Sequence, residues 1–247
     1  MDTFLIFLLV GFAAQIVDGS LGMAYGVVSS TVLISLGVPP ATASASVHAA
    51  EVFTTAASAG SHALHKNVSW RFFFPLAAAG IVGGVLGAYV LTSIDGDTIK
   101  PYVVGYLTIM GALILYRAFR KRTPRHVPRG WAAPLGLVGG FADAVGGGGW
   151  GPVVTSNLIV QGASPRMVVG TVNTSELFIA LAISGAFLFT IGFSAFGVAA
   201  LGLLIGGVAA APLGGYVAKR VPARPMMIMV GIVLTLTSLF GLWSALR

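Results

Sequence analysis

The sequence predicts an all-α, polytopic membrane protein. Of its 247 residues, 56% are hydrophobic and only 9% are charged, and the mean hydropathy is +0.93. Soluble domains carry about 25% charged residues, so a soluble globule of this composition could not cover its surface. The composition therefore excludes a soluble enzyme, a disordered protein and a nucleic-acid-binding module, although the net charge is +7. Because cysteine is absent, disulfides and thiolate metal sites are excluded as well.

Eight apolar stretches follow one another along the chain. Their continuous Leu, Ala, Gly and β-branched runs are typical of membrane helices rather than of barrel strands. A helix needs about 20 residues to cross the hydrocarbon core, and two of the stretches are much longer than that. The stretches span roughly residues 4–36, 41–64, 72–93, 101–119, 131–161, 167–190, 193–217 and 225–245.

The two long stretches, 4–36 and 131–161, are interrupted near their middles by the Gly-rich runs 18–26 and 143–152. A glycine in a helix interior costs about 1 kcal/mol relative to alanine, and Pro152 removes a backbone donor. Each long stretch is therefore predicted to be either one broken helix or a re-entrant hairpin of two half-helices.

The distribution of basic residues between the two sides of the membrane distinguishes these alternatives. The linker between the fourth and fifth stretches contains six of them, which places it in the cytoplasm. If both long stretches are re-entrant, 12 of the 14 basic residues lie on the cytoplasmic side, against 9 if each stretch crosses once. We therefore favour re-entrant stretches with both termini outside, in a multi-pass protein of a bacterial inner membrane. The linker residues are Arg117, Arg120, Lys121, Arg122, Arg125 and Arg129.

The two halves of the chain match at a constant offset of 125 residues, which predicts an internal repeat. We expect two transmembrane units of four segments each, 1–116 and 131–247, joined by a basic cytoplasmic linker, 117–130. Three crossings and a re-entrant pair per unit would invert the second unit relative to the first, as in many secondary transporters. The matched pairs include Gly11 with Gly136, Asp18 with Asp143, Tyr25 with Trp150, Pro40 with Pro165 and Glu51 with Glu176.

Four of the seven acidic residues, Asp18, Glu51, Asp143 and Glu176, lie within the predicted membrane segments. A charge at the bilayer centre costs at least about 2.5–3.5 kcal/mol, so such residues are functional candidates, here for proton coupling. His48 shares a helix face with Glu51 and suits proton transfer. Structural alternatives stay open: the aspartates as caps of the second half-helices, and the glutamates as protonated groups bonded to a neighbouring helix.

The broken helices predict an anion site without cationic side chains. Half-helix N-termini expose backbone N–H groups, and Gly-rich turns let a ligand approach them. Carboxylates nearby would repel an anion unless they are protonated, so either they carry co-transported protons or the substrate is a cation. The candidate substrate-binding residues are Ser20, Gly22, Tyr25, Ser46, His48, Gly146, Gly147, Gly148, Gly149, Trp150, Thr171 and Asn173.

Seven short blocks stand out along the chain: GFAAQ (11–15), DG (18–19), GMAYG (22–26), SVHAAE (46–51), NVSWR (67–71), GGGGWGP (146–152) and GTVNTSE (170–176). In these blocks, and over nearly its whole length, the sequence resembles the TauE/SafE family of membrane transporters, also called sulfite exporters. The resemblance implies export of sulfite or of organosulfonates such as sulfoacetate.

These observations predict a proton-linked secondary transporter that exports small sulfur oxyanions by alternating access between the two repeats. The alternative is a proton-coupled cation or metal transporter that uses the intramembrane acids and His48, although no cluster with metal-ligand spacing is visible in the sequence. A passive channel is a further alternative. Neither aspartate has the sequence context of an intramembrane protease, so we expect no enzyme. We expect no cofactor, resident metal or nucleic-acid partner, while the oligomeric state is open, a homo-oligomer included.

Overall fold

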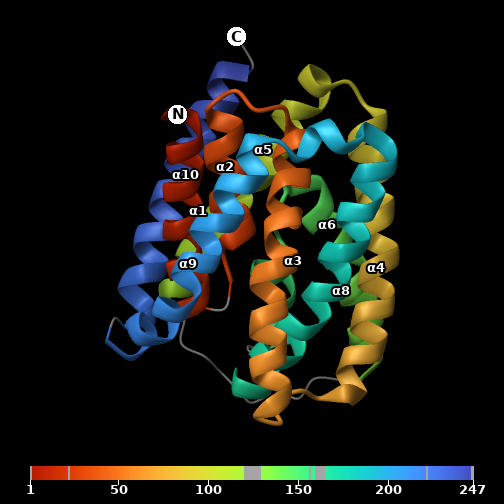
Figure 1. The fold of residues 1–247 in the computed structure, drawn as a ribbon, viewed down its shortest axis with the longest axis vertical. Helices are drawn as coiled ribbons and strands as arrows, with labels where there is room; N and C mark the ends of the chain where they lie inside the picture. The colour runs from red at the N-terminus through yellow and green to blue at the C-terminus, as the bar shows by residue number, and fades with distance from the viewer. Residues whose placement is uncertain are drawn as a thin grey trace.

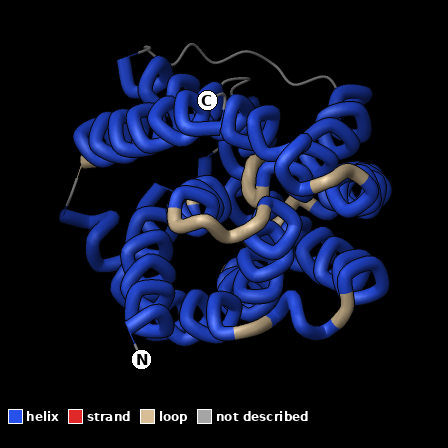
Figure 2. The backbone as a smooth tube through the Cα atoms, turned by 90° about the horizontal axis from the view of Figure 1, so that it is seen from above, coloured by secondary structure: helices blue, strands red, loops and turns tan. Residues whose placement is uncertain are grey.

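The chain folds as a bundle of helices. The computed structural model describes residues 2–21, 23–119, 129–155, 157–158, 165–220 and 222–245. No strand occurs in these ranges, which confirms the predicted all-α class (Figures 1 and 2). The elements are α1 (Asp2–Leu21), α2 (Tyr25–Ser35), α3 (Pro40–Leu64), α4 (Trp70–Ser93), α5 (Gly96–Phe119), η1 (Arg129–Trp131), α6 (Ala132–Gly146), η2 (Gly151–Thr155), α8 (Pro165–Ile191), η3 (Phe193–Phe196), α9 (Val198–Arg220) and α10 (Ala223–Ala245).

Local sequence sets several of these bounds. Pro40 and Pro165 begin α3 and α8, where a missing backbone donor costs nothing. Asp95 precedes α5, and its Oδ2 accepts hydrogen bonds from the backbone N–H groups of Asp97 (3.1 Å) and Thr98 (3.2 Å). This acid outside the apolar stretches is therefore a helix cap.

Four described helices are long and apolar enough to cross a bilayer: α4, α5, the Met167–Ile191 part of α8 and the Arg224–Trp243 part of α10. Shorter apolar helices include Tyr25–Ser35, which follows the first interruption, and Ala132–Gly146, which precedes the second. The chain is thus a multi-pass membrane protein. α3 is as long as the crossing helices but more polar, because it contains the buried Ser44, His48 and Glu51.

The two ends of the bundle differ in which turns they contain. One end, the terminus end, contains the first turn of α1, the last turn of α10 and the α4–α5 turn (Figure 1). The opposite end, the linker end, contains the α3–α4 turn, the last turn of α5 and the first turn of α10. There the Arg224 guanidinium lies 5.3 Å from the centre of the Phe119 ring.

α1 and α2 form a re-entrant pair that begins and ends at the terminus end. The start of α1 packs on the start of α9, where Gly202 lies against Phe7. The end of α2 lies beside the start of α5 and the end of α10, because Ser35, Lys100 and Gly241 line one small cavity. The chain therefore enters from the terminus end, breaks between α1 and α2, and returns (Figure 1).

α6 and η2 form the corresponding pair from the linker end. α6 runs beside α4, with Gly140 against the backbone of Gly80. After the break, an Arg117 N–H donates to the carbonyl of Pro152 (2.7 Å), which ties η2 to the end of α5. α8 then begins at the linker end, where Thr171 accepts a hydrogen bond from the backbone of the α3–α4 turn (2.8 Å).

The described basic side chains are unequally distributed between the two ends. Lys66, Arg71, Arg117 and Arg224 belong to the linker end, whereas Lys100 belongs to the terminus end. The positive-inside rule therefore indicates that the linker end faces the cytoplasm. The boundaries of the linker at 117–130, and the two-unit division that they define, stay a prediction. Arg120, Lys121, Arg122 and Arg125 lie outside the described residues.

Both breaks require unusual backbone conformations. Gly147 and Gly148 adopt φ values of 63° and 151°, and Ala24 adopts a φ of 146°. Side chains with a Cβ rarely occupy this region, so the second break depends on its glycines. Ala24 is an exception, because its backbone adopts a conformation that only a glycine would adopt without strain. Such strain persists only where the surrounding structure enforces it, and it is common at functional sites.

Candidate functional site

The two helix breaks contact each other inside the bundle. Gly26, in the first turn of α2, packs on the second break so closely that a Cβ there would lie 2.6 Å from Gly148 Cα. The Ser30 hydroxyl donates to the carbonyl of Gly147 (2.5 Å). Glycine is therefore required where the breaks meet, because any side chain would separate them.

Asp18 and Asp143 each span the break that follows them. The backbone N–H of Tyr25 donates to Asp18 Oδ1 (3.3 Å), and that of Trp150 donates to Asp143 Oδ1 (2.9 Å). In both cases the acceptor lies seven residues before the donor. Each carboxyl group thus satisfies a backbone donor where the chain resumes its helix, as the capping alternative anticipated.

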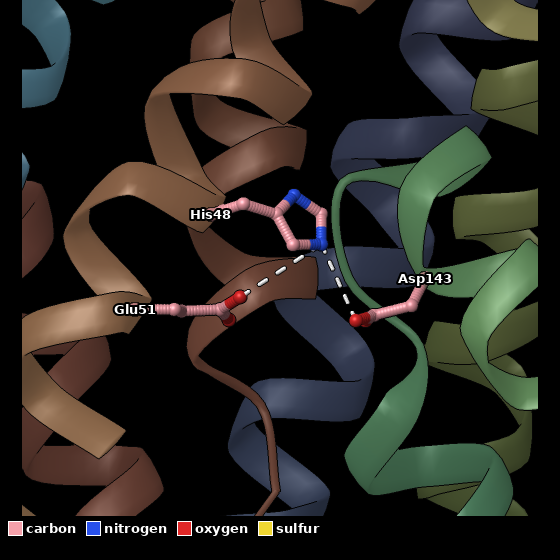
Figure 3. Close-up of side chains that lie close together, drawn as sticks. All are labelled: His48, Glu51 and Asp143. Carbon is pink, nitrogen blue, oxygen red and sulfur yellow. Dashed lines mark hydrogen bonds and ion pairs between the residues drawn. The ribbon is translucent and has the colours of Figure 1, made fainter. Parts of the chain in front are cut away.

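His48 joins the second break to α3 (Figure 3). Its Nε2 lies 3.2 Å from Asp143 Oδ2 and 4.0 Å from Glu51 Oε2. Its Nδ1 lies 2.8 Å from the backbone carbonyl of Ser44. His48 is fully buried and Glu51 is 3% exposed, so the group is shielded from water.

The hydrogen-bond partners of His48 define its protons. A carbonyl oxygen can only accept, so Nδ1 must carry a hydrogen toward Ser44. A neutral imidazole then has an acceptor at Nε2, which cannot bond to a carboxylate. The hydrogen bond to Asp143 therefore needs one further proton, located either on Nε2 or on the carboxyl group. The geometry therefore leaves one position for a proton between His48 Nε2 and Asp143 Oδ2.

All four intramembrane acids line one small buried cavity, the central cavity. It holds about 20 Å³, enough for one water molecule. Its described lining contains no Lys or Arg, so the carboxyl groups have no cationic partner around it. The lining residues are Asp18, Ala24, Tyr25, Gly26, Val27, Glu51, Thr54, Thr55, Asp143, Gly148, Gly149, Gly151, Pro152 and Glu176.

Several residues predicted for the substrate site do gather there. Tyr25, Gly148 and Gly149 line the central cavity, and His48 reaches Asp143 beside it. Asn173 lines a neighbouring, larger cavity and donates to the Ser58 hydroxyl (2.8 Å).

Other predicted residues lie outside the lining of these two cavities and contact neighbouring elements. The fully buried Trp150 donates through Nε1 to the carbonyl of Val172 (3.2 Å). Thr171 links α8 to the α3–α4 turn at the linker end. Gly146 packs on the Tyr106 ring, and Ser46 is fully buried.

Two predicted positions cannot be placed in the site. Gly22 lies outside the described residues, and the side chain of Ser20 does too.

The sequence interpretation missed two residues at the second break and in the central cavity. The Tyr106 hydroxyl, from α5, donates to the carbonyl of Gly148 (3.1 Å). Thr55 lines the cavity and donates to the carbonyl of Glu51 (2.5 Å). Because α5 contains three tyrosines, Tyr102, Tyr106 and Tyr116, the sequence does not single out Tyr106, and only the packing of α5 reveals its partner.

The tertiary structure also assembles a cluster that the sequence did not display. The ligand atoms of His48, Glu51 and Asp143 all lie within 4.8 Å of one another. Asp143 is 95 residues from His48 in the chain, so no spacing rule could have linked them.

Broken helices that meet at a buried polar cavity within a membrane-spanning bundle define a membrane transporter. The family model described as sulfite exporter TauE/SafE matches residues 7–241, so the chain belongs to this family. It is 41% identical, over 256 aligned residues, to a Bacillus subtilis (strain 168) protein named probable membrane transporter protein YtnM. That alignment covers 99% of this chain and 85% of the relative. No solved structure matches the chain.

Proposed function

We propose that this transporter exports small sulfur oxyanions, either sulfite or an organosulfonate such as sulfoacetate, in a proton-linked cycle. The observation that carries the proposal is the central cavity, where backbone N–H groups of a half-helix adjoin four carboxyl groups. The first turn of α2 directs its partial positive charge at this cavity through Gly26 and Val27. An anion would bind there without any cationic side chain.

Electrostatics would then make anion binding depend on protons. Two unit charges 4 Å apart interact by about 4 kcal/mol at an effective dielectric constant of 20. Several ionised carboxylates would therefore exclude an anion from the central cavity. Protonation of Glu51 and Glu176, together with one proton between His48 and Asp143, would reduce that repulsion. Alternating access would follow from rocking of the two units about the contact between the breaks.

Flux measurements in proteoliposomes test this proposal. Efflux of sulfite or sulfoacetate should saturate, and it should be accompanied by proton movement that a pH-sensitive dye detects. Glu51→Gln should abolish the pH dependence of the flux. Asp95→Asn is the matched control, because Asp95 caps α5 outside the cavity and should leave the flux unchanged. If neither anion binds to or crosses with the purified protein, the proposal is wrong.

A second candidate is a proton-coupled transporter of divalent metal ions, which the His48–Glu51–Asp143 cluster specifically favours. One imidazole nitrogen and carboxylate oxygens are a ligand set that zinc accepts. The same preparation decides between the two candidates. Saturable zinc or manganese binding that is lost in His48→Gln, with no binding of sulfite or sulfoacetate, would replace the anion proposal with this one.

A further inference from the structure

A second cavity, the vestibule, adjoins the central cavity and is far larger, with a volume of about 540 Å³. The two cavities share Asp18, Thr54 and Thr55 as lining residues. The vestibule also borders His62 near the end of α3 and Val169 near the start of α8, both toward the linker end. It therefore extends from the central cavity toward the cytoplasmic side, and its volume is sufficient for a small organic substrate.

The inner part of the vestibule, toward the central cavity, offers hydrogen-bond acceptors. Asp18 contributes a carboxyl group there, and Gln15 lies one turn earlier on α1. Gln15 is only 7% exposed, yet its Oε1 has no hydrogen-bond partner among the described residues. A buried amide oxygen without a donor is costly and rare, so a ligand that supplies the donor would be favoured.

The outer part offers hydrogen-bond donors. Asn173 donates to the Ser58 oxygen, which leaves the Ser58 hydroxyl hydrogen and the second Asn173 N–H available to a ligand. Ser58 and Asn173 thus form a donor-rich region of the vestibule lining.

We propose that the vestibule is the cytoplasmic binding site for a zwitterionic aminosulfonate, with the ammonium on Asp18 and Gln15 and the sulfonate on Ser58 and Asn173. An ammonium group has three donors and no acceptor, whereas a sulfonate has only acceptors. Each end of such a molecule matches one part of the lining. A substrate with a carboxylate in place of the amine would place a negative group beside the Asp18 carboxyl group. This inference rests on the proposed function and narrows its substrate class.

Binding to the purified full-length protein tests the inference without any variant. The probes are 2-aminoethanesulfonate, ethanesulfonate, sulfoacetate and sulfite, compared by titration calorimetry at one pH. We expect 2-aminoethanesulfonate to bind at least about tenfold more tightly than ethanesulfonate, the size expected for one hydrogen bond to a charged group. Equal affinities for these two would overturn the inference while leaving the proposed function standing. If no sulfonate and no sulfite binds, the proposed function itself is wrong.

Variants of Gln15 test where the ammonium group of the substrate binds. Gln15→Leu removes the acceptor at similar volume and should weaken binding of 2-aminoethanesulfonate about tenfold, with sulfite affinity unchanged. Gln15→Glu keeps an acceptor and should bind the aminosulfonate at least as tightly as the unaltered protein. Ser35→Ala, which removes an exposed hydroxyl outside the vestibule, is the control. Loss of 2-aminoethanesulfonate binding in Gln15→Glu, or an equal loss of sulfite binding in Gln15→Leu, would refute the placement.

Discussion

Replacing Asp143 by asparagine separates the structural role of this residue from its role as a proton carrier. Asp143 accepts one hydrogen bond from the backbone of Trp150 (2.9 Å), and its Oδ2 lies 3.2 Å from His48 Nε2. An asparagine keeps an oxygen for Trp150 and offers an amide N–H to the neutral Nε2 of His48. Both hydrogen bonds therefore persist in Asp143→Asn, but the proton between the two side chains is no longer needed.

The loss of stability expected for each substitution follows from the buried polar groups that it leaves without a hydrogen-bond partner. Asp143→Ala removes both partners, and two buried groups that lose their hydrogen bonds cost roughly 2–5 kcal/mol. Asp143→Asn should stay within about 1 kcal/mol of the unaltered protein. Asp18→Ala is the matched comparison at the other break, where the carboxyl group accepts a longer hydrogen bond from the backbone of Tyr25 (3.3 Å), so its cost should be smaller than that of Asp143→Ala.

Thermal unfolding in detergent measures these differences, and proton release during flux measures the coupling. We expect Asp143→Asn to unfold near the temperature of the unaltered protein and to move fewer protons per substrate. If Asp143→Asn is destabilised as strongly as Asp143→Ala, the negative charge and not the hydrogen-bond pattern holds the break. The proton assigned to the His48–Asp143 pair would then be wrong.

Three further predictions concern packing and topology. Gly26→Ala would place a Cβ 2.6 Å from the backbone of the facing break, so it should destabilise the protein by about 1–3 kcal/mol in thermal unfolding. Gly60→Ala, with nothing within 4 Å, should not destabilise it. Tyr106→Phe loses one hydrogen bond to the second break and should cost about 1 kcal/mol by the same measurement, and no change would show that this bond contributes nothing. In the naturally cysteine-free chain, Arg224→Cys should react with an impermeant thiol reagent only from the cytoplasmic side and Lys100→Cys only from outside. Labelling of Arg224→Cys from outside would overturn the re-entrant arrangement.

The sequence predicted the helices and the positions of both breaks because these depend on local chemistry. Apolar runs of bilayer length form helices wherever they occur, since no water is present to bond an open backbone. Glycine runs and Pro152 interrupt a helix without help from distant residues. The expected interruptions, 18–26 and 143–152, therefore coincide with the end of α1 and the start of α2, and with the end of α6 and the start of η2.

The hydrogen-bond partners of the polar residues were harder to predict from the sequence than the helices. The i, i+3 spacing of His48 and Glu51 predicted a pair, and their atoms lie 4.0 Å apart. The shorter contact of His48 is to Asp143, which comes from the other half of the chain. Tyr25 and Trp150 match in the repeat, yet their side chains bond to different elements, at Leu203 and Val172. Such contacts depend on how helices pack, and helical periodicity carries no information about that.

The sequence by itself determined the class of this protein, its helices, the interruption of two of them and the rarity of its intramembrane acids. The tertiary structure alone decided that the two breaks touch, that four acids line one cavity and that His48 lies within hydrogen-bond distance of Asp143. The physical reason is the range of the interactions involved. Helix formation and interruption are settled within a few residues, whereas a buried site is settled by close packing between segments about a hundred residues apart.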